Sequence, residues 1–479
     1  MTTDLPITLT DAAARLRGGQ LSSVELVRAL IERANALDPV LGTYVTRFDT
    51  GALQAARTAD DELRAGHDRG PLHGIPVGIK DVIAVADGPT TANSLVLDPT
   101  WGKDHDAPVV SRLRQAGAII TGKTTTSEFH CGLPDPTKPF AIPRNPWDLA
   151  RSPSGSSAGT GNGVAAGLFL AGLGTDTAGS LRAPASANGV TGLKPTFGRV
   201  PKSGTVPLSY SLDSLGPIAR SARDCAAVLS VIAGYHPSDE SCVDIPADTY
   251  LDALSAPLRG LRVGVELAHH SAEHADPALP ALFDQAVHAL QELGTTLVSV
   301  ELPLFDEMRA GLLATMLAEG LAYHRDDLRA RWGDYYATGR LTLACGTLVS
   351  GGDYVQAQRL RHLAQRRVAE LFDTVDVIVS PGPPRGAARS DVPLPNVVPR
   401  ILGDSFPGYW NMTGHPALSL PIGSTVDGMP LSMQIVGRPF DESLVLRVAD
   451  AYQRETDWHL KQPPLLTGLP ANSRRAPDS

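Results

Sequence analysis

The chain has 479 residues, of which 42% are hydrophobic and 19% are charged, and its formal net charge at pH 7 is −9. This composition is typical of a folded globular protein with many loops. Nucleic-acid binding is not expected, because it needs clustered lysine and arginine and the chain has no long basic run. Small neutral substrates fit this charge balance better.

The cysteines and histidines exclude several kinds of site. Cys131, Cys225, Cys242 and Cys345 lie far apart and form no CxxC pair, so neither a disulfide framework nor a zinc site is indicated. The histidines include no HExxH pair, and we expect no metal and no cofactor. The N-terminus has no signal-peptide pattern, and no apolar run reaches the roughly 18 residues that span a membrane. We therefore predict a cytoplasmic protein.

In chain order, the first clear element is an amphipathic helix, in which Ser22 and Glu25 form a capping box and apolar residues recur at helical spacing until Pro39. Farther along, apolar strand-like runs alternate with helices, and this rhythm predicts an α/β fold. The strand-like runs are residues 261–267, 295–302, 375–381, 417–423 and 431–437, and the helices are residues 279–293 and 443–455.

One lysine interrupts an otherwise apolar extended run. Lys80 lies within residues 71–85, where a charged side chain is unusual. A purely structural explanation is that its amine reaches solvent or pairs with its neighbour Asp81. From this segment alone, both that explanation and a functional one stay open.

Residues 109–124 read as a short helix, a turn at Gly117, a buried strand and a second turn. The spacing of Gly117 and the triplet 122–124, Gly-Lys-Thr, also matches a P-loop. We reject that match because residues 118–120 look like the interior of a strand, whereas a phosphate cradle needs free backbone N–H groups there.

Two sections depart from the alternating pattern. Between about residues 303 and 370 the sequence is mostly helical, which predicts an inserted helical section of the kind that shapes a pocket rim. We expect one large domain over residues 1–462, with its core at about 65–235, followed by a loose C-terminal tail at 463–479.

The stretch from Ser152 to Arg182 is dense in glycine and serine, which let backbone N–H groups approach a reacting oxygen closely. A flexible linker is the plain alternative, but residues 163–174 form an apolar run that a linker would not carry.

The serines of this stretch allow three interpretations. Residues 155–159, Gly-Ser-Ser-Ala-Gly, fit the G-x-S-x-G nucleophile elbow with Ser157 as nucleophile, but that motif follows a buried strand and residues 142–153 look like a loop. The serines could instead only cap helices and fill turns. In the third interpretation, Lys80, Ser156 and Ser180 form one proton relay.

Many segments of the chain closely resemble the amidase signature family. They are GIPVGIKD, EFHCG, NPWDLARSPSGSSAG, GLGTDTAGSLRAPA with the following GLKPTFGRV, SLDSLGPIARS, GHPALSLPIG and LSMQIVGRPFDE. Together they cover most of the chain from about residue 10 to 460, so the resemblance is far more specific than any single motif. It implies an α/β fold with a large mixed sheet that helices cover on both faces.

The resemblance implies a serine hydrolase with a Ser-cisSer-Lys triad. Ser180 matches the nucleophile, Ser156 the bridging serine after a non-proline cis peptide, and Lys80 the base. A serine hydroxyl needs such a base to attack an amide, and burial makes lysine neutral and able to accept the proton. The matching oxyanion hole consists of the backbone N–H groups of Thr177, Ala178, Gly179 and Ser180.

Further positions follow from the same resemblance. Ser157, Asp176 and Arg182 match residues that support the triad. Substrate-pocket positions are expected at His130, Cys131 and Trp410, for which ordinary packing is an equally good explanation. Many members carry glycine where Ser154, Ala158 and Ala178 stand, and an alanine beside the nucleophile restricts the backbone φ angle.

We therefore expect an amidase that hydrolyses the C–N bond of a small linear amide through an acyl-enzyme on Ser180. Carbamates, hydrazides and aryl esters are alternative substrates of the same triad. A second alternative is the glutaminase subunit of a tRNA-dependent amidotransferase, which needs a partner subunit, and a third is an inactive binding protein. The expected partner is a small-molecule amide or carbamate, with no nucleic acid and no membrane, and a homodimer stays open.

Overall fold

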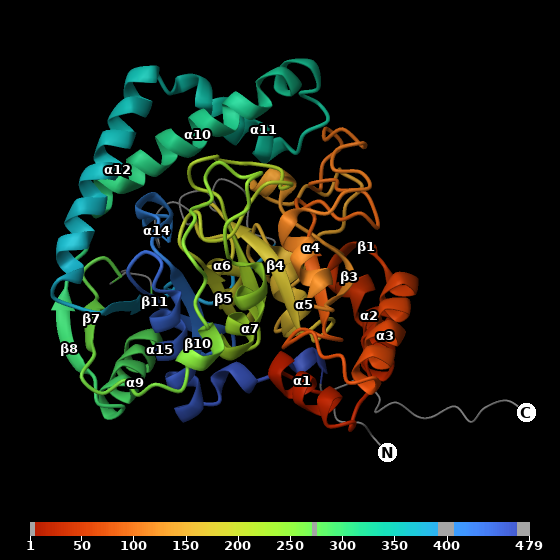
Figure 1. Cartoon of the computed structure of the whole chain (residues 1–479). Helices are drawn as coiled ribbons and strands as arrows, with labels where there is room; N and C mark the ends of the chain where they lie inside the picture. Colours follow the sequence, from red (N-terminus) through yellow and green to blue (C-terminus); the bar gives the residue numbers. More distant parts are fainter. Residues whose placement is uncertain (1–4, 271–274, 391–406, 467–479) are drawn as a thin grey trace, which may run out of the picture.

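A computed structural model of the chain describes residues 5–270, 275–390 and 407–466 (Figure 1). Its core is one sheet of eleven strands in the order β1-β3-β2-β4-β6-β5-β10-β11-β9-β7-β8. The strands are β1 (Tyr44–Arg47), β2 (Pro76–Lys80), β3 (Ile119–Thr124), β4 (Ala171–Asp176), β5 (Thr191–Lys194), β6 (Ser214–Ala219), β7 (Arg262–Glu266), β8 (Thr296–Val300), β9 (Val377–Pro381), β10 (Ala417–Ser424) and β11 (Pro430–Val436).

The sheet is mixed, as the sequence predicts. Strands β3, β2 and β4 run parallel to one another, and so do β9, β7 and β8. The neighbours between these two groups, from β4 through β6, β5, β10 and β11 to β9, pair antiparallel. The parallel pairing of β2 and β4 matters most for function, because it brings the end of β2 beside the end of β4.

The helices make up the rest of the regular secondary structure in the described residues. They are α1 (Leu9–Arg17), α2 (Ser23–Leu41), α3 (Asp49–Arg64), α4 (Pro108–Gln115), α5 (Ala158–Ala165), α6 (Arg182–Asn188), α7 (Ala222–Ile232), α8 (Tyr250–Ala253), α9 (Leu279–Glu292), α10 (Phe305–Ala330), α11 (Ala337–Ala344), α12 (Gly351–Phe372), α14 (Tyr409–Thr413) and α15 (Glu442–Glu455), with short 3-10 turns at Glu128–His130, Cys345–Leu348, Trp458–Leu460 and Pro464–Leu466.

Helices cover both faces of the sheet, and strand β6 makes this visible. Successive side chains on a strand point to opposite faces. Leu215 and Ala219 belong to the large apolar cluster that α7 and α15 share. Ile218 belongs to a separate cluster with residues of α5 and α6. The predicted fold class is therefore confirmed.

Several local predictions hold, with small shifts in where the elements end. Helix α2 has the expected capping box between Ser22 and Glu25, but it continues through Pro39 and ends where Gly42 adopts a left-handed φ of 58°. Strand β3 is buried along its whole length and extends through Thr124, where we expected a turn. A buried strand offers no phosphate cradle, so the rejection of a P-loop is correct.

Helices α10, α11 and α12 form an arm across the top of Figure 1, and side chains of α10 and α12 pack in one apolar cluster with residues of β8, β9, β10 and β11. Of the predicted tail at 463–479, residues 463–466 fall within the described part of the chain, and Pro464–Leu466 form a short turn. The domain boundaries themselves stay a prediction. Within the described part of the chain, no helix is both long and apolar enough to cross a membrane.

Candidate active site

Lys80 is the last residue of β2, and its side chain is fully buried. Its amine nitrogen Nζ lies 2.7 Å from Ser156 Oγ and 2.7 Å from Oγ1 of Thr175, which stands on the adjacent strand β4. Burial lowers the pKa of Lys80 to about 7, although the charges of Asp176 and Asp213 act in the opposite direction. A large fraction of this amine is therefore neutral near pH 7.

The structural explanation for Lys80 offered by the sequence is wrong. Its amine does not reach solvent, and its neighbour Asp81 pairs with a different lysine. That lysine, Lys123, holds its Nζ 3.1 Å from Asp81 Oδ1, and both side chains are completely buried. Among the described residues, no carboxylate is in direct contact with Lys80, which is why desolvation dominates its pKa.

Ser156 follows a cis peptide bond with Gly155, as the family resemblance implies. Its side chain is buried, and its carbonyl accepts a hydrogen bond from Ser127 N at 3.2 Å. The hydroxyl faces Lys80 Nζ. Because the Ser156 hydroxyl is both a donor and an acceptor, it can pass a proton on to the lysine.

Ser157 occupies the position that a nucleophile elbow would give to its nucleophile. It is fully buried, and its hydroxyl donates to the carbonyl of Thr175 at 3.2 Å and accepts from the N–H of Thr175 at 3.3 Å. Residues 142–153 form no strand in front of it. Ser157 therefore joins helix α5 to strand β4 and is not presented to a substrate.

Glycine at position 174 makes this close packing of Ser157 against β4 possible. A Cβ atom at Gly174 would lie 2.7 Å from Ser157 Oγ and 2.7 Å from a methyl group of Leu181. Any side chain there would push α5 away from β4. The small residues of this stretch thus let a helix and a strand approach closely, which is the reason the sequence is so dense in them.

Ser180 lies in the turn that connects β4 to α6, and its side chain is only partly buried. Among the described residues, no partner forms a hydrogen bond with its hydroxyl. Its carbonyl accepts a hydrogen bond from Ser157 N at 3.3 Å, so the backbone of Ser180 is held against the residue after Ser156. The structure thus brings Ser180 close to the Lys80 and Ser156 pair and leaves its hydroxyl available.

The predicted oxyanion donors fall into two groups. The backbone N–H groups of Thr177, Ala178 and Ser180 donate to no residue in the described part of the chain. Gly179 differs from the prediction, because its N–H already donates to Asp176 Oδ1 at 2.7 Å. Gly179 instead provides a positive φ of 116° that turns the chain toward Ser180.

Ser154, Ala158 and Ala178 stand at positions where glycine is common in the family, and they differ in backbone conformation. Ala178 does not adopt the left-handed conformation, so alanine fits there without strain, and Ala158 is the first residue of helix α5. Ser154 does adopt it, with a φ of 63°. The turn that carries the predicted oxyanion donors therefore accommodates Ala178 without backbone strain.

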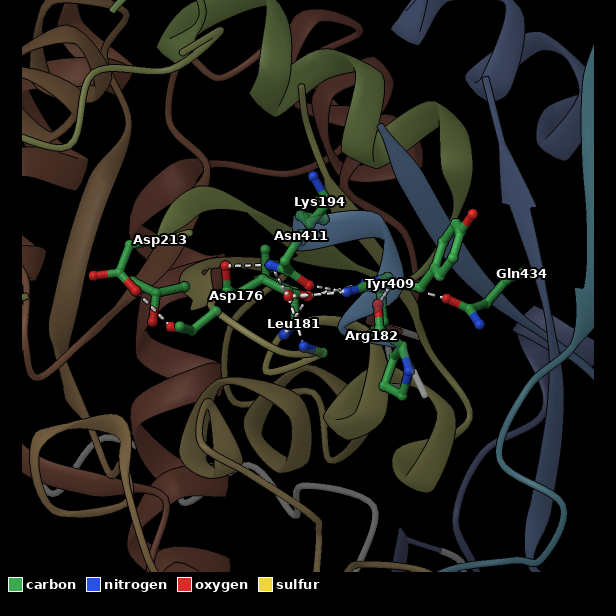
Figure 2. A network of polar contacts seen from close by, with 12 residues as sticks. Asp176, Leu181, Arg182, Lys194, Asp213, Tyr409, Asn411 and Gln434 are labelled. Atoms are coloured by element: carbon green, nitrogen blue, oxygen red, sulfur yellow. Dashed lines mark hydrogen bonds and ion pairs between the residues drawn. The ribbon is translucent and has the colours of Figure 1, made fainter. Parts of the chain in front are cut away.

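Asp176 anchors the whole turn (Figure 2). Its buried carboxylate accepts from the backbone N–H groups of Gly179 and Leu181 and from the Arg182 guanidinium, whose Nε and Nη2 each lie 3.0 Å away. Burial raises the pKa of Asp176, but the Arg182 charge and its hydrogen bonds outweigh burial and hold that pKa well below its usual range. Asp176 therefore stays ionised.

Arg182 extends this anchor to distant parts of the chain. Its guanidinium donates to Gln434 Oε1 on β11 at 3.0 Å, to the Pro407 carbonyl at 2.9 Å and to Asn411 Oδ1 on α14 at 2.7 Å. Asn411 in turn donates to the Asp176 carboxylate at 2.9 Å. Ser157, Asp176 and Arg182 thus hold the backbone around the turn, and their role in supporting a triad stays a prediction.

A second anchor holds the beginning of the turn. The Thr177 hydroxyl donates to Asp213 Oδ1 at 2.6 Å, and the other oxygen of Asp213 accepts from the N–H groups of Leu208 and Ser209. Burial raises the pKa of Asp213 despite these hydrogen bonds. The two carboxylates, Asp176 and Asp213, therefore fix the turn from both sides.

The three expected substrate residues lie in different surroundings. His130 is buried beside Thr175 and borders a cavity of about 300 Å³. Cys131 is also buried, which raises the pKa of its thiol to about 12, and the thiol lies near the Thr342 hydroxyl of α11. Trp410 packs in an apolar cluster that Ala178 also contacts. None of the three forms a hydrogen bond with the Ser180 hydroxyl, and their part in substrate binding stays a prediction.

Some residues of this site could not be singled out from the sequence. Asp213, Asn411, Gln434 and Thr175 carry no local pattern that marks them. The available signal was their place inside or beside the segments that carry the family resemblance, such as SLDSLGP for Asp213 and LSMQIVG for Gln434. In the described residues, no group of three or more His, Cys, Asp or Glu side chains could hold a metal ion.

Comparisons with known proteins identify the family of the chain. A family profile described as Amidase matches residues 25–446. An amidase from Pseudomonas putida is 39% identical over 469 residues, covering 96% of this chain and 98% of that protein. The A subunit of glutamyl-tRNA(Gln) amidotransferase from Chloroflexus aggregans is 37% identical over 486 residues, covering 96% and 98%. The native peptide amidase of Stenotrophomonas maltophilia superposes with a TM-score of 0.81 at 30% identity, covering 97% and 99%.

The fold and these relatives define the class of protein, a hydrolase that acts on amide bonds. The chain belongs to the amidase family, and its fold is that of the amidase signature enzymes.

Proposed function

We propose that the protein hydrolyses a small-molecule amide by a Ser180–Ser156–Lys80 triad with an acyl-enzyme intermediate on Ser180. The observation that carries the proposal is the 2.7 Å contact between Lys80 Nζ and Ser156 Oγ in a fully buried setting. A neutral amine at this distance can accept a proton from the Ser156 hydroxyl. Without such a base, a serine hydroxyl is too weakly acidic to attack an amide at neutral pH.

In acylation, the Ser180 oxygen attacks the substrate carbonyl carbon and forms a C–O bond. The Ser180 proton moves to the Ser156 oxygen while the Ser156 proton moves to Lys80, so that Ser156 is neutral before and after. The carbonyl oxygen becomes negative, and the free N–H groups of Thr177, Ala178 and Ser180 are the donors available to it. Loss of one such donor costs about 2.7–4 kcal/mol of transition-state stabilisation.

The tetrahedral intermediate then collapses. Lys80 returns its proton through Ser156 to the leaving nitrogen, the C–N bond breaks, and ammonia or an amine departs. Water then attacks the ester carbonyl carbon while its proton moves through Ser156 to Lys80. The bond to the Ser180 oxygen breaks, Lys80 returns the proton through Ser156 to that oxygen, and the acid is released. Carbamates, hydrazides and aryl esters present the same carbonyl chemistry, and they are alternative substrates of the triad.

A panel of purified substrates tests this proposal. The chain is assayed with small amides, anilides, carbamates, hydrazides and aryl esters, with ammonia or amine release as the readout. Wild-type hydrolysis that Ser180→Ala, Ser156→Ala and Lys80→Ala each abolish supports the proposal. Full activity in Ser180→Ala on the preferred substrate refutes it.

The glutaminase subunit of a tRNA-dependent amidotransferase is the second candidate function. The relative from Chloroflexus aggregans is named as a glutamyl-tRNA(Gln) amidotransferase component, and the match covers nearly all of this chain. Under this alternative, the substrate is glutamine and the ammonia passes to a partner protein. Glutamine hydrolysis by the isolated chain, together with capture of a stable partner from the native host, distinguishes the two candidates.

We also propose that the enzyme works in the reducing cytoplasm. The four cysteines, at positions 131, 225, 242 and 345, are all free thiols and none is paired. Disulfides form and persist in oxidising compartments, so four unpaired cysteines fit a cytoplasmic enzyme better than a secreted one.

A further inference from the structure

Lys80 has a second polar neighbour whose own contacts have a fixed direction. Thr175 Oγ1 lies 2.7 Å from Lys80 Nζ on one side and 2.7 Å from His130 Nδ1 on the other. The second nitrogen of the imidazole, Nε2, lies 2.7 Å from the backbone carbonyl of Val206. Lys80, Thr175, His130 and Val206 thus form one continuous buried chain of hydrogen bonds.

The Val206 carbonyl sets the direction of every bond in this chain. A carbonyl oxygen can only accept, so His130 carries a hydrogen on Nε2. In the neutral ring, Nδ1 is then an acceptor, and the Thr175 hydroxyl donates to it. With its only hydrogen directed at His130, the Thr175 oxygen can only accept from Lys80. One N–H bond of the lysine therefore points at Thr175.

The other face of the amine is occupied by the proposed proton relay. A neutral lysine has two N–H bonds and one lone pair, in a tetrahedral arrangement. With one N–H fixed on Thr175, rotation about the terminal bond of Lys80 is restricted, and the lone pair can be held toward Ser156 Oγ at 2.7 Å. If the Thr175 hydroxyl were free to rotate, it could donate to Lys80 and occupy the lone pair that Ser156 needs.

We propose that His130, acting through Thr175, is a positioning residue that directs the free lone pair of Lys80 at Ser156. This inference rests on the proposed function, because it concerns the proton relay of that triad. His130 also borders a cavity of about 300 Å³, and its expected part in substrate binding stays a separate prediction. His130 acts on the base through the Thr175 hydroxyl and forms no hydrogen bond with Ser180.

The charged and titratable groups around this chain favour a neutral His130. Burial lowers the pKa of His130 well below its ordinary value, and the nearby Lys80 and His324 act in the same direction, while the Val206 carbonyl opposes them. The other charged groups that face Lys80 are Asp176 and Asp213. His324, on α10, is itself held neutral by burial, which lowers its pKa to about 4. The bond directions therefore persist on mild acidification.

Variants at Thr175 and His130 separate positioning from simple packing. Thr175→Val keeps the shape of the side chain but removes the hydroxyl, and His130→Leu removes the acceptor. Both are expected to lower kcat about tenfold or more, part of the 10²–10⁴-fold that a general base contributes, with KM little changed. Thr175→Val should also move the acidic limb of the kcat profile to lower pH, since the charged form of Lys80 loses an acceptor. His130→Leu should move it in the same direction, since the freed Thr175 hydroxyl can then donate to the lone pair of neutral Lys80.

Conservative variants and a matched control complete the set. Thr175→Ser restores the hydroxyl, and His130→Asn restores an acceptor at the place of Nδ1, so each should recover most of the lost rate. Thr191→Val on β5 is the control, because it removes a similarly buried hydroxyl that bonds to the Arg220 carbonyl and to Gln453, away from Lys80. It should lower stability without moving the pH profile.

A spectroscopic measurement tests the hydrogen-bond directions at His130 independently of activity. In protein labelled with ¹⁵N-histidine, the His130 signals are identified by their loss in His130→Asn. A neutral ring with its hydrogen on Nε2 from pH 5 to 8 supports the inference. A hydrogen on Nδ1, or a charged ring in that range, overturns it even if Ser180 proves to be the nucleophile. Unchanged kcat and pH profile in folded Thr175→Val overturn it as well, whereas loss of Ser180 dependence would refute only the proposed function.

Discussion

The backbone N–H of Ser157 donates to the carbonyl of Ser180 at 3.3 Å. This single bond joins the two ends of the glycine-rich and serine-rich stretch, which are separated in the sequence by helix α5 and strand β4. It places the residue after Ser156 against the residue proposed as nucleophile. The two proposed catalytic serines therefore share one rigid backbone unit, and Lys80 approaches that unit from β2.

The pH dependence of hydrolysis follows from the environment of Lys80. The amine must be neutral to accept a proton, and burial lowers its pKa to about 7. It is therefore charged below that pH and neutral above it, so kcat should rise with pH through about 7 and fall by about tenfold per unit on the acidic side. The measurement is kcat against pH with a substrate for which chemistry is rate-limiting. A flat rate between about pH 5 and 9 contradicts the role of Lys80.

The pair of Asp176 and Arg182 should be essential for both stability and rate. Arg182→Met leaves a buried carboxylate without its charged partner, which costs about 3–5 kcal/mol. Because the same carboxylate holds the N–H groups of Gly179 and Leu181, the turn that carries Ser180 should also lose its shape. Urea denaturation and kcat of the folded fraction measure the two effects.

A second buried pair provides the control for that experiment. Arg199 Nε lies 3.3 Å from Glu442 Oε2, and both side chains are as deeply buried as Asp176 and Arg182. Arg199→Met should therefore destabilise the protein to a similar degree while the folded fraction keeps its kcat. If Arg182→Met and Arg199→Met lower kcat equally, the Arg182 effect is not specific to the turn.

Gly174 should not tolerate even one additional methyl group. In Gly174→Ala the new Cβ would lie 2.7 Å from Ser157 Oγ and 2.7 Å from Leu181, and such overpacking costs about 1–3 kcal/mol. The displaced Ser157 should also lower kcat. Gly51→Ala on α3 is the matched control, since a Cβ there meets nothing within 4 Å and should stabilise the helix by about 0.5–1 kcal/mol. Thermal unfolding of both variants checks this. A Gly174→Ala variant as stable as the wild type would show that α5 can move away from β4 at no cost.

The sequence predicts the fold of this protein well because the α/β rhythm is local. The capping box of Ser22 and Glu25 and the helix of residues 279–293 both follow from patterns within a few residues. Their ends are less predictable. Helix α2 continues past Pro39 and ends only where Gly42 adopts a left-handed conformation. Strand β3 continues through Thr124 because β1 and β2 pair with it on either side.

The site is a different matter, because it is assembled from residues far apart in the chain. The contact of Lys80 with Ser156 joins the end of β2 to the segment before α5, and no local pattern reveals it. The resemblance to a family was needed to bring these residues together. It did not reveal that Gly179 N–H is already bonded to Asp176, nor that His130 lies behind Thr175, because both depend on side-chain directions in three dimensions.

The most direct test of the proposed triad is to locate the reactive serine. The protein is treated with a serine-directed fluorophosphonate, digested, and analysed by tandem mass spectrometry, which distinguishes Ser180 from Ser154, Ser156 and Ser157. We predict one adduct, on Ser180, that forms slowly in Lys80→Ala and is absent in Ser180→Ala. An adduct on Ser156 or Ser157, or undiminished labelling of Ser180→Ala, would contradict the assignment of Ser180 as the nucleophile.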